Sequence, residues 1–344
     1  MGKYGTNYYF GNTGGINMKD IIIIGTGKAA LLHYNSYNKL NNIGNIFFVD
    51  IKKQSEYLKN VKIYPNIVQC IQENCLEKSN VIIDICTPKS EFIDILNVCK
   101  REKLSSVLIE KPFIINKKEL KKYNTLNIVM VQNYLYSKVT QEIKEYLISN
   151  KKEIDFIYTN FSKNRTIDSS NGRGCRNDIT INYEIEIPHQ VYLTQYFLNQ
   201  YKSIENRITC SQDMQLDTMN LKNHGYGLII SKCNDVNIVY ESNLTSDISQ
   251  KKIIICTKDG YVIEGNYAIY DNNLKLVKKP NINIYYKGKR TKNKNLDIDD
   301  NFTYFINDVY NYFNKKTDSL DVINIEDFSS NMQLYCKNIL NTKK

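Results

Sequence analysis

Residues 20–30 read DIIIIGTGKAA, and this stretch decides the fold. Four consecutive isoleucines bounded by polar residues are typical of a strand that is buried on both faces of a parallel sheet. The segment that follows has the form GxGxxA. Its first glycine permits a tight turn, its second lets the backbone approach a pyrophosphate, and its alanine allows a helix to pack closely on the strand. An anion at this turn would meet the unpaired N–H groups of the helix N-terminus. The candidate cofactor-binding residues of the turn are Gly25, Thr26, Gly27, Lys28, Ala29 and Ala30.

An acidic residue follows the next predicted strand. That strand covers residues 46–49 and ends at Asp50, twenty residues after Ala30. A carboxylate at this point accepts hydrogen bonds from the ribose hydroxyls and repels a 2′-phosphate. We therefore expect NAD as the preferred cofactor. NADP is the alternative, because Lys52 and Lys53 follow the acid closely.

Strands and helices alternate through the rest of the first half. Apolar runs at residues 81–86, 106–109 and 127–131 predict three more strands, and residues 91–103 predict an amphipathic helix. This alternation indicates a doubly wound parallel sheet, in which ligands bind at the carboxyl ends of the strands. The residues that follow these strands are candidates for the site: Thr87, Pro88, Glu110 and Lys111 for binding the cofactor, and Asn133 and Tyr134 for binding the substrate.

Four landmarks occur together in one order: GTGKAA, Asp50, Cys-Thr-Pro at 86–88 and Glu-Lys-Pro at 110–112. In this order and spacing they resemble the Gfo/Idh/MocA family across residues 18 to about 200. The resemblance implies an NAD(P)-dependent oxidoreductase. It also implies an N-terminal Rossmann domain, followed by a C-terminal α/β domain built on a large, open, mostly antiparallel sheet.

The same resemblance implies the catalytic residues. The family places a catalytic histidine in its second domain, often with an acid four residues earlier, and His189 matches it at the start of a predicted helix. Position 185 is Ile here, so the acid is Glu186 or Glu184. His189 would move the proton and Lys111 would orient the reacting oxygen, while Glu186 would orient the imidazole or contact the substrate. The candidate substrate contacts are Lys111, Asn133, Tyr134, Glu186 and His189, together with Arg173 and Arg176 in a polar loop that could hold an anionic group.

The second half of the chain has a different pattern. Strand-like runs at residues 227–230, 236–240, 252–257 and 261–264 have short connections, which indicates an antiparallel sheet. We divide the chain into a flexible extension (1–17), a dinucleotide-binding domain (18–134) and a substrate-binding and oligomerisation domain (135–344). One face of an open sheet must be covered, either by helices or by another subunit. We expect a homodimer or homotetramer formed through this sheet, as the resemblance also implies.

Composition excludes several other classes of protein. The 344 residues carry 46 Lys and Arg against 36 Asp and Glu, a net charge of +10, and no run is long enough to span a bilayer. Eight of the basic residues lie in 275–294, which predicts an exposed hairpin and supports nucleic-acid binding only weakly. The nine cysteines form no CxxC pair and the three histidines are not near them, so we predict no metal site. Scattered thiols point to the reducing cytoplasm.

The sequence therefore predicts an NAD(P)-dependent oxidoreductase acting on the CH–OH group of a sugar, amino sugar, cyclitol or similar small polar substrate. One alternative is an imine (C=N) reductase of the same fold. The other is a cofactor-binding scaffold or regulatory protein without turnover.

Overall fold

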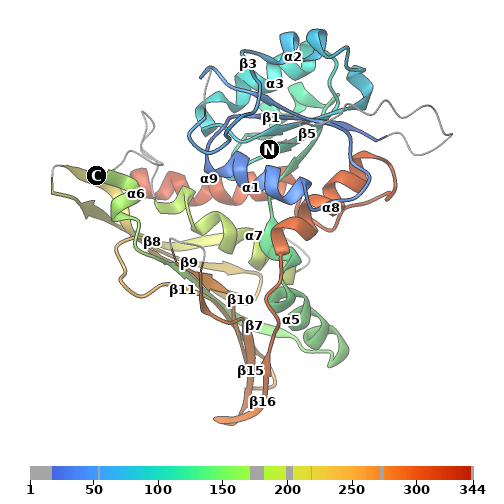
Figure 1. Ribbon diagram of the computed structural model, residues 1–344. Coiled ribbons are helices and arrows are strands. Elements are labelled where there is room, and N and C mark those ends of the chain that lie inside the picture. Colours follow the sequence, from blue (N-terminus) through green and yellow to red (C-terminus); the bar gives the residue numbers. More distant parts are fainter. Residues whose placement is uncertain are drawn as a thin grey trace.

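The computed structural model describes residues 18–52, 55–170, 182–198, 204–217, 219–271 and 275–341. Two large sheets and the helices packed on them make up this part of the chain, which is an α/β protein as predicted (Figure 1). Among the described residues, no helix is both long and apolar enough to cross a membrane.

The first sheet has six parallel strands in the order β3-β2-β1-β4-β5-β6. The strands are β1 (Asp20–Ile24), β2 (Ile46–Val49), β3 (Ile63–Tyr64), β4 (Val81–Ile85), β5 (Ser106–Ile109) and β6 (Asn127–Met130). The four isoleucines of β1 are buried, and so is all of β4, which explains why both sequences are continuous apolar runs. The strand order reverses between β1 and β4, and sheets of this kind bind ligands at such a point. The predicted doubly wound sheet is confirmed.

Helices from both ends of the chain cover this sheet. The connections contain α1 (Lys28–Tyr37), α2 (Ile67–Glu73), α3 (Phe92–Arg101) and α4 (Lys117–Leu120). A further helix, α8 (Asn301–Phe313), comes from the far end of the chain and shares a buried cluster with β1 and α1. In this cluster Phe302 and Phe305 pack with Ile21, Ile23 and Ala30.

The second sheet has eight strands in the order β16-β15-β12-β11-β7-β10-β9-β8, and only the β7–β10 pair is parallel. The strands are β7 (Ile154–Ser162), β8 (Ile204–Gln215), β9 (Asn220–Cys233), β10 (Val236–Asn243), β11 (Gln250–Thr257), β12 (Tyr261–Asn266), β15 (Asn281–Tyr286) and β16 (Lys289–Asn295). Beside it lies a short pair, β13 (Ile269–Tyr270) and β14 (Leu276–Lys278). The large, mostly antiparallel sheet expected for the second half is confirmed.

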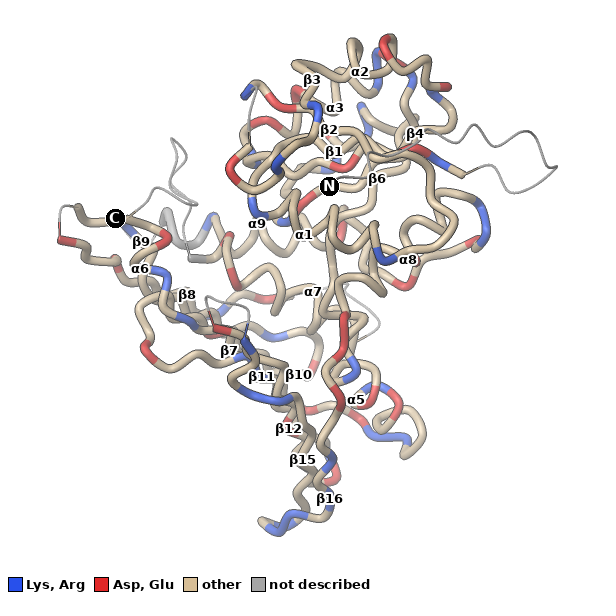
Figure 2. Tube along the Cα trace, viewed as in Figure 1, with Lys and Arg blue, Asp and Glu red and all other residues tan. Residues whose placement is uncertain are grey.

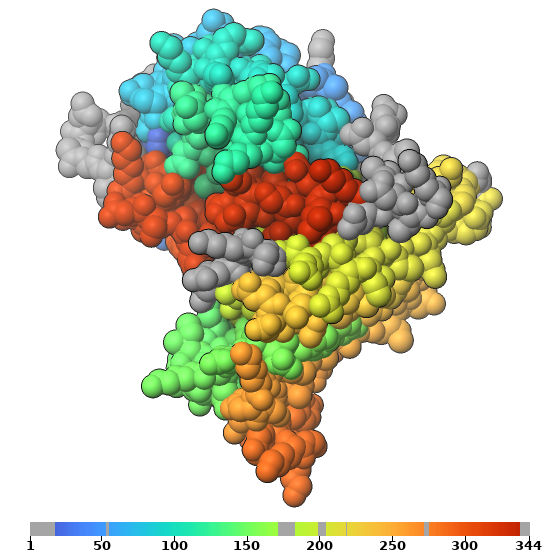
Figure 3. All heavy atoms as spheres, turned by 180° about the vertical axis from the view of Figure 1, so that it is seen from behind, coloured from blue at the N-terminus to red at the C-terminus, as the bar shows by residue number. Residues whose placement is uncertain are grey.

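One face of the second sheet is covered by α5 (Lys138–Ser149), α7 (Ile187–Leu198) and α9 (Ile325–Asn341). Seen from behind, α9 lies between the first domain and the second sheet (Figure 3). The predicted basic hairpin is the β15–β16 pair, in which β16 is mostly exposed while Ile282 and Ile284 of β15 are buried. The hairpin projects from the far end of the sheet with basic residues at its tip (Figure 2). Its reversal uses Gly288, whose φ of +74° lies in the left-handed region.

Candidate active site

The glycine turn between β1 and α1 has the form that a bound pyrophosphate requires. Gly25 has φ +98°, and a Cβ there would lie 2.9 Å from the carbonyl oxygen of Cys86, so only glycine fits. A Cβ on Gly27 would meet nothing within 4 Å, which shows open space in front of the turn. Gly27 caps α1 without a side-chain hydrogen bond, so N–H groups of the first helical turn are available for an anion.

Two other features fit the same cofactor. Asp50 follows β2, where its carboxylate accepts hydrogen bonds from Thr26 Oγ1 (2.7 Å) and the backbone N–H of Lys52 (2.9 Å). Thr87 follows β4, and its buried hydroxyl has no hydrogen-bond partner among the described residues. These groups and the open turn fit a dinucleotide: the turn would hold the pyrophosphate and Asp50 the adenosine ribose. Ala29 and Ala30 lie on the first turn of α1, and Pro88 follows Thr87.

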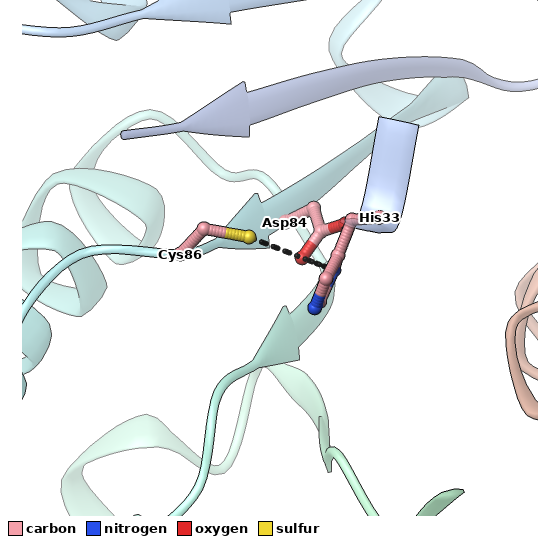
Figure 4. Close-up of side chains that lie close together, drawn as sticks. All are labelled: His33, Asp84 and Cys86. Carbon is pink, nitrogen blue, oxygen red and sulfur yellow. Dashed lines mark hydrogen bonds and ion pairs between the residues drawn. The ribbon is translucent and has the colours of Figure 1, made fainter. Parts of the chain in front are cut away.

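A buried charged cluster lies beside this turn. His33 of α1 points toward Asp84 of β4 (Figure 4), and on its other side it contacts Glu110, which follows β5. Its Nδ1 lies 3.0 and 2.8 Å from the two carboxylate oxygens of Asp84, and its Nε2 lies 3.0 Å from Glu110 Oε1. Ionised carboxylates only accept hydrogen bonds, so both ring nitrogens donate and His33 is positively charged. Burial opposes this charge, but Asp84 outweighs burial and raises the pKa of His33 well above 6.5.

The hydrogen bonds continue from this cluster to the Glu-Lys-Pro segment. Burial by itself would raise the pKa of Glu110, but the hydrogen bond from His33 brings it below its ordinary value. The other oxygen of Glu110 accepts the backbone N–H of Lys111 at 3.1 Å. A chain of hydrogen bonds thus links β4, α1 and the backbone of the candidate catalytic lysine.

His33, Asp84 and Cys86 are also residues of the types that bind metals, and their ligand atoms lie within 4.8 Å of one another. The sequence hides this group because His33 is far from the other two along the chain. In the structure the ring nitrogens of His33 already face carboxylates, and Cys86 Sγ donates to Asp84 at 3.6 Å. Burial and the charge of Asp84 raise the pKa of the Cys86 thiol, which opposes the thiolate that would bind a metal. Interior hydrogen bonds account for all three side chains, and the absence of a metal stays a prediction.

Lys111 connects the two domains. It follows β5, and its Nζ donates a 2.8 Å hydrogen bond to the backbone carbonyl of Ile185, just before α7. Burial lowers the pKa of Lys111 from 10.5 to about 8. With this pKa the side chain can donate a proton as the ammonium and accept one as the neutral amine near neutral pH.

His189 lies in the first turn of α7 with its imidazole against aromatic rings. Its Nδ1 is 2.9 Å from the hydroxyl of Tyr192, and that hydroxyl also accepts the backbone N–H of Tyr134 at 3.3 Å. The hydroxyl hydrogen of Tyr192 is left to donate to Nδ1, which assigns the proton of the neutral ring to Nε2. Burial, and then the positive charge of Lys111, hold the pKa of His189 well below 6.5.

Glu186 has different partners from those expected. Its carboxylate lies 2.8 Å from Arg165 Nη2 and 3.4 Å from Lys163 Nζ, and no hydrogen bond joins it to the described imidazole of His189. Burial would raise its pKa, but Lys163 and Arg165 hold the pKa well below its ordinary value. Orientation of the imidazole therefore falls to Tyr192, while Glu186 anchors two cations.

The structure brings together most of the residues singled out from the sequence. Lys111, Glu186 and His189 meet at the domain junction, where Tyr134 packs edge-on against His189 with ring centroids 5.0 Å apart. Asn133 begins the short helical turn, Asn133–Tyr136, that contains Tyr134. Arg173 and Arg176 lie outside the described residues.

Sequence reasoning missed five polar residues near the site: His33, Asp84, Lys163, Arg165 and Lys251. Asp84 carried a usable signal, since it is the only charged residue in an otherwise apolar strand, and a buried carboxylate needs a partner. Lys163 and Arg165 belong to a polar segment, and nothing in the local sequence separates them from ordinary surface cations. Lys251 occupies a strand position where nothing in the local sequence predicts a role.

Comparisons with known proteins identify the fold. No family model matches the chain, and no curated protein matches its sequence. Among solved structures, a UDP-N-acetylglucosamine 3-dehydrogenase from Acidithiobacillus ferrooxidans is similar with a TM-score of 0.68 and 12% identity, covering 92% of this chain and 96% of that one. A dehydrogenase from Clostridium difficile is similar with a TM-score of 0.65 and 16% identity over 94% and 99% of the two chains. A 3-ketoreductase from Actinomadura kijaniata, crystallised with TDP-benzene and NADP, is similar with a TM-score of 0.69 and 10% identity over 93% and 96%. The chain shares the two-domain fold of these oxidoreductases.

Proposed function

We propose that the protein is an NAD(P)-dependent oxidoreductase that transfers a hydride between nicotinamide and a CH–OH or C=O carbon of a small polar substrate, such as a sugar, amino sugar or cyclitol. The observation that carries this proposal is the meeting of Lys111 and His189 at the carboxyl ends of the parallel strands, beside a glycine turn shaped for a dinucleotide. The similar fold of the known dehydrogenases and the ketoreductase supports it.

The geometry supports a division of work between Lys111 and His189. The nicotinamide would supply or accept the hydride. Lys111, with a pKa of about 8, is suited to exchange the proton of the reacting hydroxyl, and its charge stabilises a negative reacting oxygen. A neutral His189 with its proton on Nε2 would donate a hydrogen bond to the same oxygen. This assignment exchanges the roles expected from the sequence, in which His189 moves the proton.

Cofactor binding is the first test. The chain contains no Trp, so the fluorescence of a reduced nicotinamide can be followed with little protein background. We expect NADH to bind more tightly than NADPH, because Asp50 faces the position of the ribose hydroxyls and repels a 2′-phosphate. The Asp50→Ser variant should reduce the difference in affinity between NADH and NADPH. If neither nucleotide binds, the oxidoreductase proposal fails and the scaffold alternative gains.

Gly27→Ala gives a sharper version of this test. A methyl group at position 27 meets no protein atom within 4 Å, so the melting temperature should not change. The methyl group would project into the space where the pyrophosphate should lie, so NADH binding should weaken at least about tenfold. Unchanged affinity for NADH would place the dinucleotide elsewhere.

A second copy of the chain is the partner we propose for the open face of the eight-stranded sheet. Side chains on that face, such as Tyr158, Lys252 and Ile254, are half-buried in the single chain, whereas their neighbours facing α7 are buried. Light scattering should give the mass of a dimer or tetramer, and a monomer at micromolar concentration would contradict it.

A further inference from the structure

Four cations surround one acid at the domain junction. We call Lys111, Lys163, Arg165, Lys251 and Glu186 the cationic cluster. Arg165 and Lys163 both contact the same carboxylate oxygen of Glu186, at 2.8 and 3.4 Å. The charges of Lys111 and Lys251 also act on Glu186, but neither lysine makes an ion pair with it. Asp168 also contacts Arg165, at 3.8 Å, so four cations face two carboxylates and the net charge is about two positive units.

Lys111 and Lys251 lack counter-ions. Each is half-buried, and each donates to a neutral group: Lys111 to the carbonyl of Ile185 at 2.8 Å and Lys251 to the hydroxyl of Tyr134 at 2.6 Å. Within the described ranges, neither has a carboxylate inside ion-pair distance. A charge withdrawn from water without a partner is costly, and a bound anion would relieve that cost.

Arg165 supplies an independent observation. Two of its guanidinium nitrogens contact Glu186 and Asp168, at 2.8 and 3.8 Å. Its Nε is buried and donates to no acceptor in the described part of the chain. Buried donors are nearly always satisfied, so an unpaired one inside a cation-rich site indicates a missing acceptor.

We propose that the substrate carries a compact oxyanion, a carboxylate or phosphoryl group, close to its reacting carbon, and that the cationic cluster binds this group. The inference rests on the proposed function, because Lys111 belongs both to the cluster and to the reacting centre. Because Lys111 would contact both the anion and the reacting oxygen, the anionic group should lie close to the reacting carbon, and a neutral hexose or cyclitol would leave the charges unpaired. The substrate class is therefore a sugar acid or sugar phosphate.

The site is reachable in part from solvent. The side chains of Lys163 and Arg165 are 35% and 17% exposed, whereas Glu186 is 4% exposed. An incoming anion would therefore meet the two cations that already hold Glu186, and then the unpaired ammonium groups behind them. A carboxylate or phosphate accepts several hydrogen bonds at once, which matches a fork of guanidinium and ammonium donors.

The test compares three probes on the NADH-loaded protein: D-glucuronate, D-glucose 6-phosphate and D-glucose, at equal ionic strength. Binding is measured by calorimetry and by the shift in melting temperature. We expect at least one anionic sugar to bind and glucose not to bind, and the stronger anion shows whether the site prefers carboxylate or phosphate. Glucose binding as well as the anions, or no binding by either anion, would overturn the inference.

A pair of neighbouring lysines supplies the matched control. Lys251 and Lys252 are consecutive in β11, so their side chains lie on opposite faces of the sheet, and Lys252 lies over the ring of Tyr158. Lys251→Gln should weaken the anion at least about tenfold, because it removes a charged hydrogen-bond donor. Lys252→Gln should leave its affinity unchanged. Equal affinities in the two variants would place the anion elsewhere.

The two proposals can fail separately. The same anionic probes are also titrated without nucleotide, and NADH is titrated without the probes. If anions bind with the Lys251 dependence but no nucleotide binds, the oxidoreductase proposal fails and the anion site stands. If NADH binds and no anion does, the anion site fails and the oxidoreductase proposal stands.

Discussion

His33 and His189 lie near the same junction between the two sheets, in opposite electrical surroundings. His33 is enclosed by two carboxylates and is charged, whereas His189 lies among lysines and aromatic rings and is neutral. Around His33 each charge has a partner. Around His189 two ammonium groups have none in the described chain. Removing one partner from a balanced buried pair leaves an uncompensated charge, whereas the unbalanced charges near His189 are those that the proposed anion would neutralise.

The largest expected effect concerns the unbalanced region. Replacing Lys111 with Met keeps the length of the side chain but removes the proton-exchanging group, so turnover of the sugar acid or sugar phosphate should fall about 10²–10⁴-fold. NADH affinity should change little. Lys117→Met is the control, because Lys117 pairs with Glu326 on the surface. Retained turnover in Lys111→Met would show that Lys111 does not exchange the proton of the reacting hydroxyl.

Changes to the buried His33–Asp84 pair should alter the stability of the fold. Asp84→Leu leaves the buried imidazolium of His33 without its main partner, and we expect a loss of about 3–5 kcal/mol in the free energy of unfolding. The double variant Asp84→Leu with His33→Leu removes both charges and should recover at least half of that loss. Urea unfolding measures both. Purely additive losses would show that the two residues do not act as a pair.

The pKa values of the two histidines should be shifted in opposite directions from the ordinary value. The chain has only three histidines, so nitrogen-detected NMR can follow each ring. His33 should stay charged throughout the neutral pH range, and the ring of His189 should stay neutral at pH values well below 6.5. A raised folded pKa gives His33 a stabilising effect that is complete below 6.5 and is lost as the pH rises through the folded value. For His189 the sign is reversed, and its contribution is lost as the pH falls below 6.5. Equal pKa values for His33 and His189 would contradict the opposite electrical surroundings of the two rings.

The smallest effect should come from the hydroxyl that orients His189. Tyr192→Phe removes the donor to Nδ1 and should cost about 0.5–1.5 kcal/mol of stability. The ring can then exchange its tautomer, which changes the nitrogen shifts of His189 and leaves those of His33 unaltered. Tyr196→Phe is the matched control, since Tyr196 contacts Asp321 instead. A spectrum of His189 that does not change in Tyr192→Phe would exclude the proposed tautomer.

Local sequence was enough to predict the parallel sheet of the first half. The apolar run of β1, the glycine turn and the strand at Val81–Ile85 are local signals, and the structure has them where they were expected. The second sheet could be predicted as a class but not in its strand order. The pairing of β7 with β10, for example, joins segments that are far apart in the chain.

The site could be predicted where a residue belongs to a motif. Lys111 in Glu-Lys-Pro and His189 at a helix start were found in this way, and both lie at the junction. His33 and Lys251 could not be, because their partners come from other strands and helices and exist only after folding. The charges that surround a residue depend on which distant segments fold next to it, and local sequence does not contain that information.

The position of α8 has a consequence for how the chain is made. The helix that covers β1 is encoded about 170 residues after the last strand of the first sheet. At roughly 5–20 residues per second, synthesis exposes this apolar face for on the order of 10–30 s before Asn301–Phe313 emerges. A chain that stops before Asn301 would keep the face exposed and aggregate. The parallel sheet therefore depends on a late segment of the chain for the cover of one of its faces.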